Sequence, residues 1–267
     1  MCRFAAYHGE NPMLMADLMT SSKNALIYQR DMEQAGEPDI MNADGFGMGW
    51  YDHNIDELPA VYRSIQPVWN DQNLAHIANK IQSNTLVGHI RAATVGDINS
   101  ANCHPFFHKD LMMVHNGSIH GIHLFKKAFV AHMSDDSFNH IKGNTDTEYL
   151  FHTISSQLNQ LEKAQSNGKD LVKVIRDVFS FIASLDQEHD TYSRINIILT
   201  NGRQMLATRW SSKPNDDVLK MYFKPSQDGV IIASEHLDDS DDWEILPRQH
   251  ILLVSQQYKY SLTQVHA

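Results

Sequence analysis

The order of the expected strands and helices predicts an α+β fold, in which two antiparallel sheets pack face to face and helices cover their outer sides. Strand-like segments dominate the first part of the 267-residue chain, two long helices lie between residues 143 and 186, and strand-like segments return after residue 190. Strands and helices do not alternate, which disfavours a doubly wound parallel sheet. Hydrophobic residues make up 42% of the chain and charged residues 20%, so a large core is available.

In the first half, glycines at positions 45, 47 and 49 alternate with large apolar residues, a pattern typical of a strand with one face pressed against another backbone. The Asn-Gly pair at 116–117 predicts a turn that ends the preceding strand. The expected elements are strands at 2–8, 42–52, 60–65 (the hairpin partner of 42–52), 85–93 and 110–115, a helix and loop within 12–34, and a helix at 72–83.

In the second half, the segment 143–158 has a clear helix start. Thr145 is placed to act as N-cap, and Glu148 three residues later completes the pattern of a capping box. The other expected elements are helices at 122–132 and 169–186, a hairpin turn at 201–203, and strands at 194–200, 204–210, 219–224, 229–234, 250–255 and 258–265.

Cys2 is the first candidate for chemistry. Its side chain is small enough that removal of Met1 is expected, which leaves a thiol and a free α-amine on one residue. An α-amine has an ordinary pKa of about 7.7–8.0, so it is partly neutral at physiological pH and can accept the thiol proton. Cys2 can therefore supply both nucleophile and base, although a cysteine at position 2 is by itself a weak signal.

Three further segments contain groups that suit such a reaction. Arg91, with Thr94, follows an expected strand and can grip a carboxylate. Asn116 and Gly117 can direct an amide and a backbone N–H at a developing oxyanion. Asp146, in the first turn of a helix, can hold an ammonium group or merely complement the helix dipole. Taken alone, each has an ordinary structural explanation.

Composition excludes several other classes. The net charge of −10 argues against nucleic acid or an anionic membrane as partner. The N-terminus does not resemble a secretory signal, and no stretch approaches the length of a membrane span, so we expect a soluble, cytoplasmic protein. The sixteen histidines are scattered without zinc-site spacing, so we expect no metal and no cofactor. We expect Cys103, beside His104, to be a buried or loop thiol.

Together, the segments MCRF, NADGFGMGW, GHIRAAT, NCHPF, HNGSI and GNTDTEYL resemble the class II glutamine amidotransferases. The similarity is greatest to a stand-alone branch that includes the γ-glutamyl hydrolase of ergothioneine biosynthesis and the amidase subunit of a fungal glutathione-degrading complex. The resemblance implies a four-layer αββα N-terminal-nucleophile fold. It also implies one domain over residues 1–267, with catalytic motifs within 2–150 and sheet-completing strands within 190–267.

The resemblance further implies the site roles. Cys2 is the nucleophile and its α-amine the base, while Asn116 and Gly117 form the oxyanion hole. The implied substrate contacts are Arg91 and Thr94 on the α-carboxylate and Asp146 on the α-ammonium. The reaction is cleavage of a γ-glutamyl amide bond through a γ-glutamyl thioester on Cys2.

The chain also departs from synthase-linked members of the family. Val95 replaces a histidine, and Met41-Asn42 replaces an Arg-Gly pair, so the leaving amine stays open between ammonia and a larger compound. Two alternatives to a free-standing hydrolase remain. The chain is a glutaminase subunit that passes ammonia to a separate synthase, or a non-catalytic γ-glutamyl-binding protein. A homodimer or a separate synthase or peptidase partner is compatible with the sequence.

Overall fold

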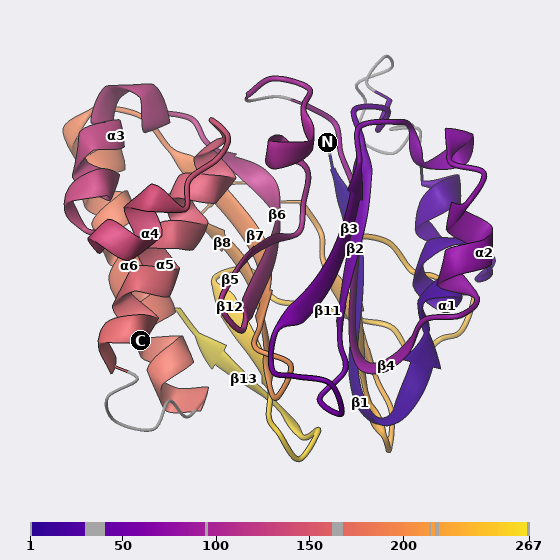
Figure 1. The fold of residues 1–267 in the computed structure, drawn as a ribbon. Helices are drawn as coiled ribbons and strands as arrows, with labels where there is room; N and C mark the ends of the chain where they lie inside the picture. The colour runs from indigo at the N-terminus through magenta and orange to yellow at the C-terminus, as the bar shows by residue number, and fades with distance from the viewer. Residues whose placement is uncertain are drawn as a thin grey trace.

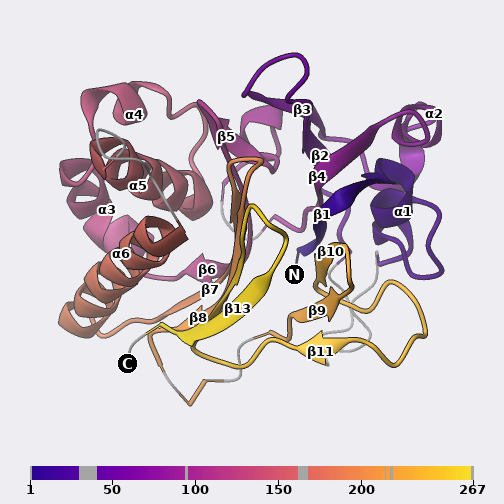
Figure 2. The same ribbon diagram turned by 90° about the horizontal axis from the view of Figure 1, so that it is seen from below.

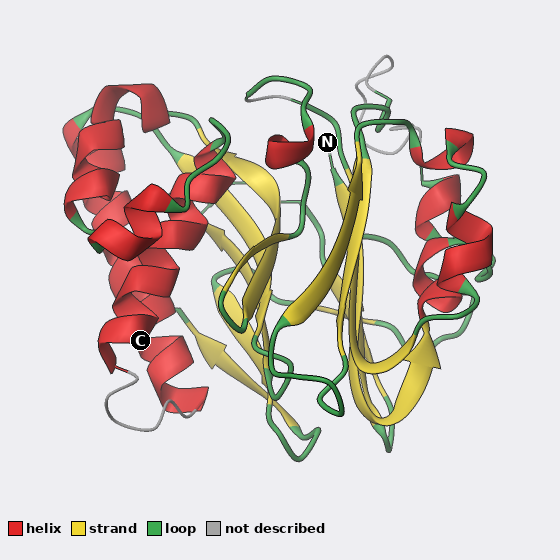
Figure 3. Ribbon diagram, viewed as in Figure 1, coloured by secondary structure: helices red, strands yellow, loops and turns green. Residues whose placement is uncertain are grey.

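The computed structural model describes residues 2–29, 41–93, 96–161, 168–213, 215–216 and 219–265. Two antiparallel sheets face each other, and helices cover the outer face of each one (Figure 1). Coloured by secondary structure, the layers read helix, sheet, sheet, helix (Figure 3). The predicted α+β fold and its αββα layering are therefore confirmed.

The first sheet has seven strands in the order β11-β9-β10-β1-β4-β2-β3. β1 occupies its centre because it pairs with β10 on one side and with β4 on the other. Figures 1 and 2 both place the beginning of β1 in the space between the two sheets. The strands of this sheet are β1 (Arg3–Leu14), β2 (Phe46–Tyr51), β3 (Pro59–Ser64), β4 (Gln82–Ile90), β9 (Tyr222–Pro225), β10 (Gly229–Ala233) and β11 (Glu244–Ile245).

The second sheet has six strands in the order β13-β12-β8-β7-β6-β5. The strands that follow residue 190 thus complete both sheets. The strands of the second sheet are β5 (Phe106–His108), β6 (Leu111–Ile119), β7 (Ser193–Thr200), β8 (Met205–Ser211), β12 (His250–Val254) and β13 (Tyr260–Gln264).

The helices divide between the two outer faces (Figure 1). Within the described part of the chain, two short α-helices cover the first sheet, α1 (Met15–Met19) and α2 (Leu74–Ala78), and four α-helices cover the second, α3 (Ile122–Ala131), α4 (Asp135–Asn139), α5 (Asp146–Leu161) and α6 (Gly168–Glu188). Buried side chains form three clusters: one between the sheets and one under each helix layer. Figure 2, seen from below, shows the same division of the helices between the two outer faces.

Several expected elements have different bounds in the structure. The helix expected at 72–83 is only Leu74–Ala78, because Gln82 already begins β4. The strand expected at 219–224 starts at Tyr222. Of the segment 12–34, residues 15–19 are helical, and residues 30–34 lie outside the described part. The short elements β5, β11 and α4 were not predicted, because segments of two to five residues are too short to show a periodicity.

The glycines of β2 allow close packing, as their alternation predicted. A Cβ added at Gly47 would lie 2.0 Å from the backbone carbonyl oxygen of His104. Since backbone cannot rotate away as a side chain can, only glycine fits here without moving a strand. Gly47 therefore fixes the distance between β2 and the segment that enters β5.

We expect Gly47→Ala to lower the free energy of unfolding by about 3 kcal/mol, the upper end of the usual overpacking cost. Gly88→Ala is the matched control. Within 3 Å its Cβ would meet only side-chain atoms, Met19 Sδ at 2.5 Å and Leu26 Cδ1 at 2.9 Å, so we expect it to cost about 1 kcal/mol. Urea denaturation measures both values, and equal losses would contradict the backbone explanation.

The start of α5 has the predicted N-cap but not the predicted capping box. Thr145 Oγ1 accepts a hydrogen bond from the Glu148 N–H at 3.2 Å. The Glu148 carboxylate, however, accepts from the backbone N–H groups of Lys142 and Gly143 at 2.7 and 2.8 Å, upstream of the cap. Glu148 thus fixes the loop that leads into α5, and Asp146 is held in the first helical turn.

Candidate functional site

Cys2 lies immediately before β1. Its side chain contacts the backbone of Ala92, the residue that follows Arg91. Its Sγ is 3.4 Å from both the carbonyl oxygen of Ala92, to which it donates, and the Ala92 N–H, from which it accepts. Cys2 is half-buried. Burial raises the pKa of its thiol, whereas the Ala92 N–H and the Arg91 charge act to lower that pKa. The raised pKa means that the resting group is a thiol, which needs a base before it can attack.

Arg91 directly follows β4 and is 2% exposed. Its guanidinium donates to the carbonyl oxygens of Asp97 at 3.2 Å and Gly96 at 3.5 Å. Thr94, its predicted companion, lies outside the described residues. Arg91 is thus a buried cation close enough to Cys2 for its charge to act on the thiol.

The NADG segment holds the backbone around Arg91. The Arg91 N–H donates to the Gly45 carbonyl at 2.8 Å, and the Asp44 N–H donates to the Arg91 carbonyl at 3.0 Å. The Asp44 carboxylate accepts from the Ala93 N–H at 2.7 Å. The sequence assigned no role to Asp44, because that role depends on pairing between residues that are far apart in the sequence.

Asp146 begins α5 and is buried. Its Oδ2 accepts from the Ile119 N–H at 2.8 Å, and its Oδ1 accepts from the Thr147 N–H at 2.8 Å. These two backbone donors fix the carboxylate at the end of β6. The charge of Asp146 acts to raise the pKa of Cys2, so an anion and a cation both lie within electrostatic range of the thiol.

Asn116 and Gly117 lie within β6, and the predicted turn at this point is wrong. The strand continues through both residues, which pair with Asn196 and Ile195 of β7. A Cβ on Gly117 would lie 2.0 Å from the Arg194 carbonyl oxygen, so the glycine serves close strand packing. β6 contacts β1 across the interface between the sheets. Asn116 is buried, and its Oδ1 has no hydrogen-bond partner among the described residues.

Three buried histidines, His89, His104 and His115, connect the two sheets near the candidate site. The ring centroids of His89 and His104 lie 4.0 Å apart, and His89 Nε2 is 3.3 Å from the carbonyl oxygen of His115. His115 Nδ1 shares a hydrogen bond of 2.9 Å with Thr147 Oγ1, next to Asp146. Burial lowers the pKa of His89 to about 3 and that of His104 well below its usual range, so both are neutral. Sequence reasoning missed this group because its members meet only in the folded chain.

Cys103 is a buried thiol in a loop segment, as predicted. It is fully buried, and its Sγ lies 3.5 Å from the carbonyl oxygens of Ser64 and Asn99. The neighbouring His104 packs its ring on His89. Cys103 and His104 therefore do not form a catalytic pair.

A family model, described as glutamine amidotransferases class-II, matches residues 15–214, about three quarters of the chain. The chain belongs to this family. The predicted resemblance is confirmed, and this class II amidotransferase is an enzyme of the amidohydrolase type. The matched range contains Arg91, Asn116, Gly117 and Asp146 but begins after Cys2.

Two relatives of this amidotransferase cover almost all of it. The probable glutamine amidotransferase DUG3 of Saccharomyces cerevisiae is 28% identical, over 96% of this chain and 82% of the yeast protein. The γ-glutamyl-hercynylcysteine sulfoxide hydrolase of Mycolicibacterium smegmatis is also 28% identical, over 94% of this chain and 95% of its own length.

Solved structures agree with the fold. A glutamine aminotransferase class-II domain protein from Silicibacter pomeroyi superposes with a TM-score of 0.70 at 25% identity, covering 98% of this amidotransferase and 99% of that chain. The glutamine phosphoribosylpyrophosphate amidotransferase of B. subtilis has a TM-score of 0.66 at 15% identity, covering 99% of this chain and 49% of its own. Among the described residues, no helix is long and apolar enough to span a membrane.

Proposed function

We propose that the chain hydrolyses a γ-glutamyl amide bond with Cys2 as nucleophile. The observation that carries this proposal is a thiol immediately before β1, within electrostatic range of a buried cation, Arg91, and a buried anion, Asp146. That charge pair complements the carboxylate and ammonium of an α-amino acid. The name of the mycolicibacterial relative, a hydrolase of a γ-glutamyl compound, supports the same substrate class.

The proposed reaction needs a base, since burial raises the pKa of the Cys2 thiol. After removal of Met1, the α-amine of Cys2 takes the thiol proton, and sulfur attacks the γ-carbonyl carbon. The C–N bond breaks as the proton passes to the leaving amine, which leaves a γ-glutamyl thioester on Cys2. Water then hydrolyses the thioester, releasing glutamate and restoring the thiol.

The oxyanion formed during attack needs donors, and Asn116 with Gly117 is our proposal for them. Asn116 is buried on β6. An oxyanion needs N–H groups, so in this proposal the Nδ2 of Asn116 and the backbone N–H of Gly117 face the developing charge. Such a preorganised donor typically contributes about 10²–10³-fold to kcat.

The α-amine is tested by blocking it. A chain with extra residues ahead of Met1, so that Cys2 is never N-terminal, keeps the thiol but loses the base. We expect glutamate release from γ-glutamyl-p-nitroanilide to fall by about 10²–10⁴-fold, the usual contribution of a general base. Intact-mass measurement confirms which form is present.

The control is the same extension joined through a protease site that leaves Cys2 as the first residue after cleavage. Cleavage should restore the activity. Full activity of the uncleaved chain would exclude the α-amine as base, and an inactive chain with a free Cys2 amine would favour the non-catalytic binding protein.

The names of the two relatives differ on the leaving amine, since one is a probable glutamine amidotransferase and the other hydrolyses a larger γ-glutamyl compound. We propose that the larger γ-glutamyl compounds are the substrates. Comparison of kcat/KM for glutamine with that for γ-glutamyl dipeptides decides the point. A strong preference for glutamine, with activity that depends on an added synthase, would favour an ammonia-donating subunit instead.

A further inference from the structure

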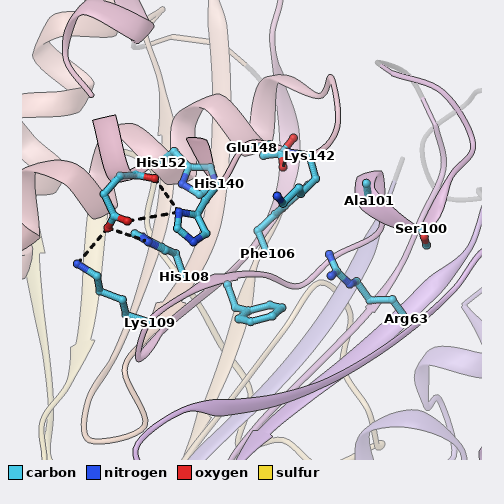
Figure 4. A pocket seen from close by; sticks show the side chains of 12 residues that line it. Arg63, Ser100, Ala101, Phe106, His108, Lys109, His140, Lys142, Glu148 and His152 are labelled. Carbon is cyan, nitrogen blue, oxygen red and sulfur yellow. Dashed lines mark hydrogen bonds and ion pairs between the residues drawn. The ribbon is translucent and has the colours of Figure 1, made fainter. Parts of the chain in front are cut away.

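A second group of chemically reactive side chains lies between the edge strand β5 and helices α4 and α5. They line a cavity of about 550 Å³ (Figure 4). His108 ends β5, Asp136 lies on α4, His140 follows α4, and His152 lies on α5. One ligand-type atom from each of His108, Asp136 and His140 lies within 4.8 Å of the others.

The distances suit shared coordination. His108 Nε2 lies 3.2 Å from Asp136 Oδ2, and His140 Nδ1 lies 3.5 Å from Asp136 Oδ1. His140 Nδ1 also donates to the backbone carbonyl oxygen of Asp136 at 2.6 Å, and an ion bound through Nδ1 would replace this bond. Zn²⁺ binds nitrogen and oxygen at about 2.0–2.2 Å, so two ligand atoms of a tetrahedral site lie about 3.4 Å apart. Two of the three ligand pairs are therefore near the separation that one ion requires, although they use different oxygens of Asp136, and the atoms of all three residues lie within 4.8 Å of one another.

The ring of His108 is held by a hydrogen bond to its second nitrogen, as is usual for metal-binding histidines. It is 4% exposed, and its Nδ1 shares a hydrogen bond of 2.9 Å with Ser155 Oγ on α5. That bond fixes the ring so that Nε2 faces Asp136 and the cavity. A hydrogen bond from the second ring nitrogen normally sets the orientation and tautomer of such a ligand.

His152 provides an independent indication of a ligand. It is 2% exposed, and its Nδ1 has no hydrogen-bond partner among the described residues. It lines the same cavity, and its ring centroid is 5.6 Å from that of His108. A buried polar atom without a partner is costly, and a bound ion or its water would satisfy it.

Lys109 competes for the same carboxylate. Its Nζ lies 3.3 Å from Asp136 Oδ2, and both side chains are half-exposed. An exposed ion pair of this kind contributes little stability, so a metal ion can displace the ammonium group at small cost. The exposed side of Asp136 and His140 also leaves a path for the ion to enter.

We propose that His108, Asp136 and His140 bind one divalent transition-metal ion, with Zn²⁺ the best match to two imidazoles and a carboxylate. His152, or a water held by it, completes the coordination. The ion would join α4 to β5 and α5. The sequence led us to expect no metal because its histidines show no zinc-site spacing. The proposed ligands, at positions 108, 136 and 140, come together only in the folded chain, and no short motif describes their spacing.

The test measures Zn²⁺ binding by isothermal titration calorimetry on the full chain carrying Cys2→Ser, which removes the reactive thiol as a competing ligand. We expect one ion per chain. Asp136→Asn and His140→Ala should each weaken binding at least tenfold, and Ser155→Ala should weaken it by a smaller factor. His76→Ala, which removes an exposed histidine from α2, is the matched control and should change nothing.

Co²⁺ spectra provide a second readout. We expect the absorption of a tetrahedral site with nitrogen and oxygen ligands and no thiolate charge-transfer band, and we expect His140→Ala to abolish it. Both ligand variants change half-exposed side chains, so they should fold, and circular dichroism checks this. Absence of saturable Zn²⁺ binding, or binding unchanged in both variants, would overturn the proposal without affecting the proposed function of Cys2.

Discussion

Cys2→Ala should abolish glutamate release, with a loss on the order of 10⁴-fold or more in kcat, because the proposed reaction has no other nucleophile. The half-buried thiol lies against the Ala92 backbone, so its removal deletes one sulfur atom and leaves β1 in place. The measurement is release of glutamate from γ-glutamyl-p-nitroanilide, with labelling of the chain by a glutamine-analogue diazoketone as second readout.

Cys103→Ala is the matched control. Cys103 is the second cysteine of the chain, is fully buried, and contacts the carbonyl oxygens of Ser64 and Asn99. We expect its kcat to stay within a few-fold of the wild type and one equivalent of label to remain on Cys2. Turnover retained by Cys2→Ala, or label found on Cys103, would refute the nucleophile assignment.

Arg91→Lys should lower kcat/KM by about 30-fold or more, since disruption of a buried, hydrogen-bonded contact to a carboxylate costs at least about 2 kcal/mol. Lysine keeps the charge but cannot present the flat, two-pronged donor set that matches a carboxylate. Arg91 is almost fully buried beside Cys2, where water does not screen the contact. Most of the loss should appear in KM if the carboxylate is bound equally in ground and transition states.

A substrate analogue separates binding from folding. Arg91 also donates to the Gly96 and Asp97 carbonyls, so the substitution also weakens the loop. The proposed role predicts that a γ-glutamyl amide with its α-carboxylate converted to an amide is poor for the wild type and no poorer for the variant. A purely structural role predicts the same fractional loss on both substrates. Arg176→Lys, which changes a hydrogen-bonded arginine of α6, controls for general destabilisation.

The sequence predicted those site features that depend on local pattern. Thr145 caps α5 and Asp146 occupies its first turn, because capping depends on residues only three apart. Arg91 follows directly after β4, because a run of strand-forming residues ends there. The alternate glycines of β2 also predicted close packing of one strand face, since a Cβ at either position would meet a neighbouring backbone or side chain.

Local pattern failed where pairing partners decided the conformation. Asn116 and Gly117 have the sequence of a turn, yet they lie within a strand because they pair with β7. β7 follows α5 and α6 in the sequence, so this pairing leaves no local signal. Asp44 gave no signal of its role, since its hydrogen bond to Ala93 joins residues 49 positions apart. Glu148 had the spacing for a capping box, but its carboxylate accepts hydrogen bonds from the N–H groups of Lys142 and Gly143 instead.

The sequence by itself therefore determined the types of group at the candidate site, the order of the longer strands and helices, and the family. Only the tertiary structure placed Cys2 beside Ala92 and within range of the Arg91 and Asp146 charges, and only it gathered His108, Asp136 and His140 around one cavity. The physical reason is the sequence separation between the residues that decide each feature. Periodicity and capping arise from contacts within a few residues, whereas the neighbours of a strand end are decided by sheet pairing and by apolar burial between the two sheets.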